Sequence, residues 1–248
     1  MLLTLGKPLQ EFALLSALEK LNVGNLILWF VVLLFSLSFH EAAHAWTSER
    51  FGDDTGRYQG RITLNPLAHI DPIGTVIFPI VSFIWGVPLF GWAKPVQTNP
   101  LLWREKNKAN ISVSAAGPIS NFILATVAFA VAKILMATGH LFPAGGDMFD
   151  LVVPAFSPQG HSIAMEALAK ILSVMIMLNV MLGVFNLIPV PPLDGSHVLE
   201  SLLPYELAKA YEQIRPYGWL LLYALLFLGV LWAIFIPVHF MIMLLLRL

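Results

Sequence analysis

The chain has 248 residues, of which 58% are hydrophobic and only 12% charged, and its mean hydropathy is +0.77. A soluble domain carries about 25% charged residues, so this composition excludes an ordinary soluble protein and indicates a polytopic membrane protein. A net charge of −1 does not indicate a basic surface for binding nucleic acid. The absence of cysteine excludes disulfides and thiolate metal ligands. Any metal site must therefore use histidine and carboxylate side chains.

Four apolar runs are long enough, at about 1.5 Å per residue, to cross a membrane core of roughly 30 Å. They cover residues 23–46, 111–136, 163–188 and 217–236. Residues 1–21 mix apolar and charged side chains and predict an amphipathic helix at the membrane interface. The stretch after Pro237 is too short to cross by itself.

Two further elements are expected between the first and second spans. Tyr58–Leu64, in a polar region rich in glycine, predicts one or two short strands. Residues 73–92 are apolar but contain Pro79, Gly86 and Pro88, which predicts a re-entrant segment that returns on the side it entered. We therefore expect an all-α polytopic membrane protein with a small membrane-associated β element, forming a single domain over residues 1–248 with its core at about 23–200.

The distribution of basic residues predicts the orientation. Seven lie between the first and second spans: Arg50, Arg57, Arg61, Lys94, Arg104, Lys106 and Lys108. The loop at 138–161 has none. By the positive-inside rule, residues 50–108 are cytoplasmic, and the 138–161 loop and the N-terminus lie outside.

The motif His40-Glu41-Ala-Ala-His44 lies near the end of the first span. Residues four apart share a helix face, so both imidazoles can bind one Zn²⁺, and Glu41 can act as the base toward a water molecule. The alternative is a polar helix end that meets the lipid headgroups, which accounts poorly for three ionisable groups on adjacent turns. Ionisable groups inside a membrane usually mark function.

A catalytic zinc site usually has a third protein ligand, and Asp194 is the leading candidate. It lies in the turn Pro-Pro-Leu-Asp-Gly after the third span, which brings it to the same side of the membrane as His40. The alternative is that Asp194 caps a helix that begins near His197. His197 could also reach a metal, although a place on a helix face is favoured, and turn formation is favoured for His69 and Asp71.

Three motifs in this order resemble the site-2 protease family of intramembrane zinc metalloproteases, in particular its compact members without PDZ or CBS domains. They are HEAAH, GPISN at 117–121 and NLIPVPPLDG at 186–195, and LNPLAHIDPIGT and FGWAKPV between them are similar too. The resemblance covers about residues 35–200. It implies a three-span catalytic core in which His40, His44 and Asp194 hold one zinc ion and Glu41 is the general base.

The resemblance also implies that Asn186 positions the substrate or stabilises the oxyanion. Asn121 matches a second asparagine of the family and is a candidate for substrate binding. Lys94 is a candidate contact to substrate or to lipid headgroups.

We therefore expect an integral membrane endopeptidase, in the cell membrane of a prokaryote, that cleaves membrane-protein substrates in or near a transmembrane segment. Its active site would face the cytoplasmic side, and the edge of Tyr58–Leu64 could hold an unwound substrate. Two alternatives come from other classes. A metal transporter should carry further acids or histidines along its spans, and an inactive relative should lack Glu41 or a ligand.

Overall fold

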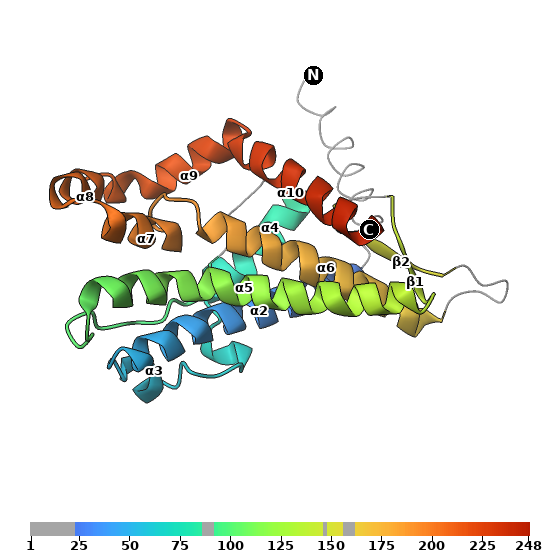
Figure 1. Cartoon of the computed structure of the whole chain (residues 1–248), viewed down its shortest axis with the longest axis horizontal. Helices are drawn as coiled ribbons and strands as arrows, with labels where there is room; N and C mark the ends of the chain where they lie inside the picture. The colour runs from blue at the N-terminus through green and yellow to red at the C-terminus, as the bar shows by residue number, and fades with distance from the viewer. Residues whose placement is uncertain (1–22, 86–91, 146–147, 156–161) are drawn as a thin grey trace, which may run out of the picture.

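The structure, a computed structural model, describes residues 23–85, 92–145, 148–155 and 162–248. Its centre is a bundle of three long helices, α2 (Val23–Arg50), α5 (Lys106–Ala137) and α6 (Ile163–Asn186) (Figure 1). The helix α10 (Val230–Arg247) packs on this bundle, where Ile242 and Leu246 join a buried apolar cluster with residues of α5 and α6. Ala128, Ala132 and Ala169 belong to this cluster, and their small side chains let the helix backbones approach closely.

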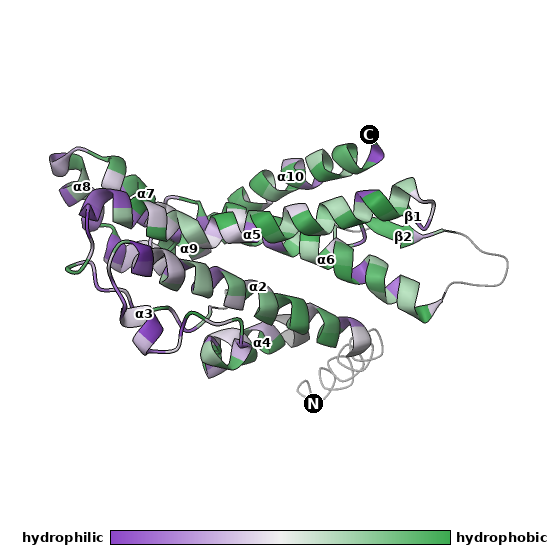
Figure 2. Ribbon diagram, turned by 60° about the horizontal axis from the view of Figure 1, so that its bottom comes forward, coloured by the Kyte–Doolittle hydropathy of each residue, from purple (hydrophilic) through white to green (hydrophobic). Residues whose placement is uncertain are grey.

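Within the described ranges, four helices are long and apolar enough to cross a membrane: α2, α5, α6 and α10. Their outer faces carry exposed apolar side chains such as Ile27, Ile123 and Val127, as a lipid environment requires. The hydrophilic residues gather at one end of the bundle, around α3, α7 and α8 (Figure 2). The predicted all-α polytopic membrane fold is confirmed.

The first three spans lie where they were predicted, but the fourth does not. The run 217–236 is broken at Gly229, whose φ of 74° ends α9 (Gly218–Phe227), and the spanning helix α10 begins at Val230. This helix continues through Pro237 to Arg247, so the last stretch is part of a span and not a separate short segment. The prediction was wrong because the residues on both sides of Gly229 are equally apolar, and hydropathy does not show that a residue adopts the left-handed conformation that ends a helix.

The predicted strands at Tyr58–Leu64 are wrong. That region begins with a short helix, α3 (Thr55–Tyr58), and continues as turns. The Arg61 guanidinium donates to the Ala68 carbonyl and the His69 ring contacts the Thr63 carbonyl, so the region bonds to its own loop and not to a strand. The two-stranded antiparallel sheet instead joins β1 (Leu141–Pro143) to β2 (Val152–Pro154) at the other end of the bundle.

The segment predicted to be re-entrant has its two described ends side by side, and its residues 86–91 lie outside the described residues. After the short turn η1 (Pro66–Ala68), a π-helical turn η2 (Pro72–Ile77) leads into α4 (Phe78–Trp85). The Asp71 carboxylate caps η2 by accepting from the amides of Ile73 and Gly74, which confirms a turn role for this residue. Trp92 then lies against Gly74, because its amide donates to the Gly74 carbonyl at 3.3 Å and its carbonyl accepts from the Thr75 hydroxyl at 2.8 Å.

Three short helices complete the polar end: α7 (Asp194–Leu202), α8 (Tyr205–Glu212) and η3 (Arg215–Tyr217). The C-terminal ends of α2 and α6, which the charge pattern predicts to be cytoplasmic, lie at the same end of the bundle as α7 (Figure 1). The helix predicted for residues 1–21 lies outside the described residues.

Candidate metal centre

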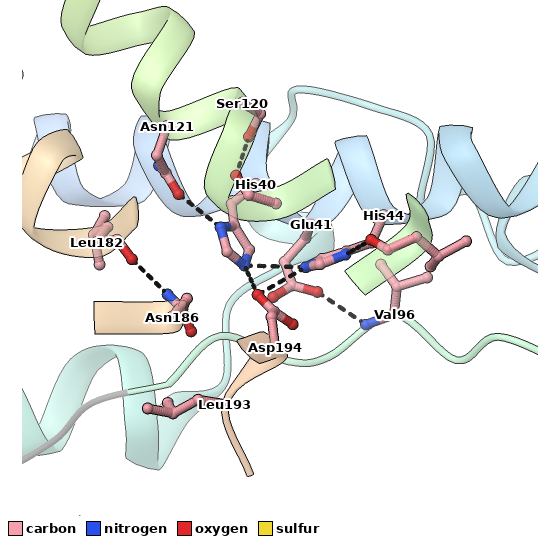
Figure 3. A network of polar contacts seen from close by, with 12 residues as sticks. His40, Glu41, His44, Val96, Ser120, Asn121, Leu182, Asn186, Leu193 and Asp194 are labelled. Atoms are coloured by element: carbon pink, nitrogen blue, oxygen red, sulfur yellow. Dashed lines mark hydrogen bonds and ion pairs between the residues drawn. The ribbon is translucent and has the colours of Figure 1, made fainter. Parts of the chain in front are cut away.

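The two histidines of α2 point the same ring nitrogen, Nε2, toward one place (Figure 3). The Nδ1–H of His40 donates to the Asn121 side-chain oxygen at 2.6 Å, and the Nδ1–H of His44 donates to the Val113 carbonyl at 2.7 Å. Each Nδ1 is therefore occupied by an acceptor on α5, which leaves each Nε2 with a free lone pair. The two Nε2 atoms lie 3.1 Å apart. Second partners of this kind commonly orient the histidine ligands of metals.

Gly117 on α5 makes room for both rings. A Cβ atom at this position would lie 2.4 Å from His44 Nε2 and 2.5 Å from both Cε1 and Nε2 of His40. No side chain fits in that space, so the glycine allows α5 to pass directly beneath the two imidazoles. This glycine opens the GPISN motif, from which only Asn121 was predicted to have a role.

Asp194 comes to the same place from the other end of the chain. One carboxylate oxygen, Oδ2, lies 3.2 Å from His40 Nε2 and 3.4 Å from His44 Nε2. Asp194 is the first residue of α7, and Gly195 beside it packs so closely that a Cβ there would lie 2.2 Å from the Leu187 carbonyl oxygen.

These three side chains fit a zinc ion. Their ligand atoms lie within 4.8 Å of one another, and within the described ranges they form a group that could hold a metal. Asp194 Oδ2 is a buried atom that accepts no hydrogen bond, and a bound cation would satisfy it. Two imidazoles and one carboxylate are a donor set that zinc favours in catalytic sites, where the fourth position stays open.

A cavity of about 940 Å³ opens beside the three ligands and is lined by Glu41 and Asn186 as well. The Glu41 carboxylate accepts from the Val96 amide at 3.0 Å. The Asn186 amide group donates one hydrogen to the Leu182 carbonyl at 2.9 Å, which leaves its second N–H for another partner. A carboxylate and an amide donor thus share one cavity with the metal ligands.

The cavity wall at 92–106 is fixed to the end of α2 by Asp53. This buried carboxylate accepts from the Ser48 hydroxyl at 2.8 Å and from the amides of Thr55 and Asn99 at 3.0 and 2.7 Å. Burial raises the pKa of Asp53, but these hydrogen bonds stabilise the charged form and lower it overall. Trp103 adds a bond from its indole N–H to the Ser48 hydroxyl at 2.7 Å.

The other predicted site residues lie farther from the ligands. Asn121 is fully buried behind His40, and its described contacts are with His40 and Asn179. Lys94 is exposed next to the cavity-lining Ala93 and Pro95. His69 is buried in its turn, where its carbonyl accepts from the Lys94 amide.

His197 lines the cavity, but the cluster formed by the described residues does not include it. Burial and the neighbouring Arg215 lower the pKa of His197. Its Nδ1 faces Arg215 at 3.4 Å, away from the ligands.

Comparison with known families agrees with this geometry. The family described as "Peptidase family M50" matches residues 28–229, which include all three candidate metal ligands. The chain belongs to peptidase family M50. This is the site-2 protease family, so the resemblance drawn from the three motifs is confirmed.

Curated relatives of this M50 chain carry matching names. "Putative zinc metalloprotease YwhC" of Bacillus subtilis is 36% identical over 190 residues, covering 77% of this chain and 75% of the relative. "Putative zinc metalloprotease Rip2" of Mycolicibacterium smegmatis is 30% identical over 205 residues, covering 82% and 68%. Rip2 of Mycobacterium tuberculosis is 30% identical over 186 residues, covering 75% and 61%. No solved structure matches the chain.

The family supplies the identity of the cofactor, and the described residues offer a possible place for it. Zinc is the cofactor of this M50 metalloprotease, and His40, His44 and Asp194 are the residues that fit it. Sequence reasoning missed four groups around the site: the Val113 carbonyl bonded to His44, Gly117 beside both rings, the Val96 amide bonded to Glu41, and Asn179 bonded to Asn121. Three of these act through the backbone or through an absent side chain, so residue type carries little signal of their role.

Proposed function

We propose that this chain is an intramembrane zinc endopeptidase that hydrolyses peptide bonds in or near transmembrane segments of membrane-protein substrates. The observation that carries the proposal is the convergence of the three ligands with Glu41 on one cavity beside a membrane-spanning helix. His40 lies about 25 Å from the start of α2, at about 1.5 Å per residue, so the site lies at membrane depth near the polar end.

The roles of the side chains follow from their places. Bound zinc would supply a Lewis acid that polarises water and the substrate carbonyl. Glu41 accepts a proton from the water whose oxygen bonds to the carbonyl carbon. Asn186 donates its second N–H to the oxygen on which negative charge develops. When the carbon–nitrogen bond breaks, Glu41 returns the proton to the leaving amine.

The two other readings fit the site less well. A transporter needs further ligands along its path, and within the described ranges the one metal-capable group is the three-ligand cluster. A cavity of about 940 Å³ is also far larger than a bare ion needs and falls in the range of pockets that hold sizeable ligands. An inactive relative is disfavoured because Glu41 and all three ligands are present.

Charge supports a cytoplasmic site. The seven basic residues between Arg50 and Lys108 belong to the segment at the polar end, where α2 ends and Asp194 lies. Under the positive-inside rule this end is cytoplasmic, and the sheet β1–β2 lies outside. We place the protein in the cell membrane of a prokaryote, as the bacterial relatives suggest.

The test is Glu41→Gln, which keeps the shape of the side chain and removes its ability to accept a proton. Cleavage should fall at least about 100-fold, the usual contribution of a general base, while zinc content stays unchanged. Membrane proteomics should show uncut transmembrane proteins accumulating with this variant, some of them trapped on it. The matched control is Glu49→Gln, because Glu49 lies two turns along α2 and pairs with Arg57 outside the cavity. Normal cleavage by the Glu41→Gln protein with full zinc would refute the assignment of the base.

A further inference from the structure

A chain of buried amides leads away from the metal centre across all three central helices. Beyond His40 and Asn121, the Asn121 side-chain nitrogen donates to the Asn179 oxygen at 2.8 Å. The Asn179 nitrogen donates in turn to the Ser36 hydroxyl and to the Met175 carbonyl, both at 2.9 Å. Asn121, Asn179 and Ser36 are each 0% exposed. An asparagine inside an apolar spanning helix is costly unless its amide is fully bonded, so this chain requires an explanation.

The hydrogen bond from Asn179 to the Met175 carbonyl determines the donor and the acceptor in each of the other hydrogen bonds of this series. A backbone carbonyl can only accept, so the group that Asn179 turns toward Met175 must be its NH₂. The Asn179 oxygen then faces Asn121 and can only accept, which requires Asn121 to turn its own NH₂ toward it. The Asn121 oxygen is consequently left facing His40 Nδ1.

We propose that Asn179 is a positioning residue of the zinc site, which acts through Asn121 to determine which nitrogen of His40 carries the hydrogen. An oxygen at Nδ1 requires the hydrogen there and leaves Nε2 bare for the metal. An Asn121 turned the other way would present its NH₂ to Nδ1, and the hydrogen would move to Nε2, the atom that faces Asp194. This inference rests on the proposed role of His40 as a zinc ligand.

The first test removes the amide at position 179. Asn179→Leu is similar in size and leaves Asn121 free to turn, so zinc affinity, measured by competition with a chromophoric chelator, should fall about 10- to 100-fold. The matched control is Ser173→Ala, which removes an equally buried polar group of α6 that bonds to the amides of Leu151 and Val152, away from the metal centre. Wild-type zinc affinity in Asn179→Leu would overturn the proposal.

The second test distinguishes orientation from packing. A carboxylate presents an acceptor whichever way it turns, so Asn121→Asp should restore zinc affinity in the Asn179→Leu background. Failure of this double variant to bind zinc, when it unfolds at the wild-type temperature, would show that Asn179 only fills space.

A third measurement needs neither metal nor activity. In the zinc-free protein, ¹⁵N resonances of the His40 ring should show a protonated Nδ1 and a bare Nε2, and Asn179→Leu should shift the hydrogen toward Nε2. An unchanged His40 spectrum in that variant overturns the proposal even if the double variant does not fold. These readouts are independent of proteolysis, so a protein that follows them but cuts no peptide would refute the proposed function and leave the role of Asn179 standing.

Discussion

Replacing Gly117 with alanine should empty the zinc site without unfolding the bundle. The new methyl carbon would lie 2.4 Å from His44 Nε2 and 2.5 Å from His40 Nε2, whereas ordinary contacts are at about 3.5 Å. Each ring would have to retreat by about 1 Å, and zinc–ligand distances tolerate only about 0.2 Å. The rings cannot retreat easily because Asn121 and the Val113 carbonyl hold their other nitrogens.

Zinc affinity should therefore fall by more than the roughly 10- to 100-fold that follows loss of one outer partner of a ligand. The zinc-free protein should lose only about 1–3 kcal/mol, the usual cost of an extra carbon in a packed interior. The assay is zinc per chain and chelator competition, with the unfolding temperature of the metal-free protein measured beside it. Gly145→Ala is the control because its Cβ would meet nothing within 4 Å. One tightly held zinc in Gly117→Ala would show that the rings do not sit above this glycine.

Three further predictions concern the ligands, the cavity wall and the orientation. Asp194→Ala should lose most of its zinc while His197→Ala retains it, and metal analysis showing the reverse would exchange their roles. Asp53→Asn should lower the unfolding temperature at pH 7, because a charged acceptor of three hydrogen bonds is worth about 1–3 kcal/mol. Because folding lowers the pKa of Asp53, its contribution to the stability of the folded protein is fully present above the unfolded pKa of about 3.9 and is lost as the pH falls through the folded pKa. The unfolding temperatures of wild type and variant should therefore converge in acid. In this cysteine-free chain, Gly145→Cys should react with an impermeant thiol reagent from outside the cell and Leu207→Cys only from the cytoplasm, and the opposite pattern would invert the topology.

The features that local physics controls could be predicted from the sequence. Spans follow from hydropathy over some twenty residues, and the pairing of His40 with His44 follows from the period of the helix. Asp194 was a weaker prediction because its approach to the histidines depends on the turn after α6. Asp194 was placed near the histidines because the turn was expected on the same side of the membrane as His40, and because the motifs resemble those of the family.

Three features of the structure could not be predicted from the sequence, each for a physical reason. At Tyr58–Leu64 the pattern resembled a strand, but a strand needs a partner that sequence does not show, and Gly56 instead packs its backbone closely against Ala45 of α2. At Gly229 one backbone angle divides an apolar run that reads as continuous. Asn179 is a third case: it was one polar residue in an apolar run, and its bond to Ser36 joins residues 143 positions apart.

The positions of the three ligands along the chain give the ion a mechanical role. Two of them come from α2, and the third, Asp194, follows the turn after α6. Gly218 at the start of α9 packs against the same turn, so closely that a Cβ at Gly218 would lie 2.1 Å from the Pro191 carbonyl oxygen. Zinc bound by these three side chains would therefore be a cross-link that closes a loop of roughly 150 residues and ties the last part of the chain to the first, as a disulfide would in a chain that has cysteines. At a free zinc concentration 100 times its dissociation constant, this fastening adds about 2.7 kcal/mol to the folded state. Chelation should loosen α7 and α9 from the bundle before it unfolds α2, α5 and α6.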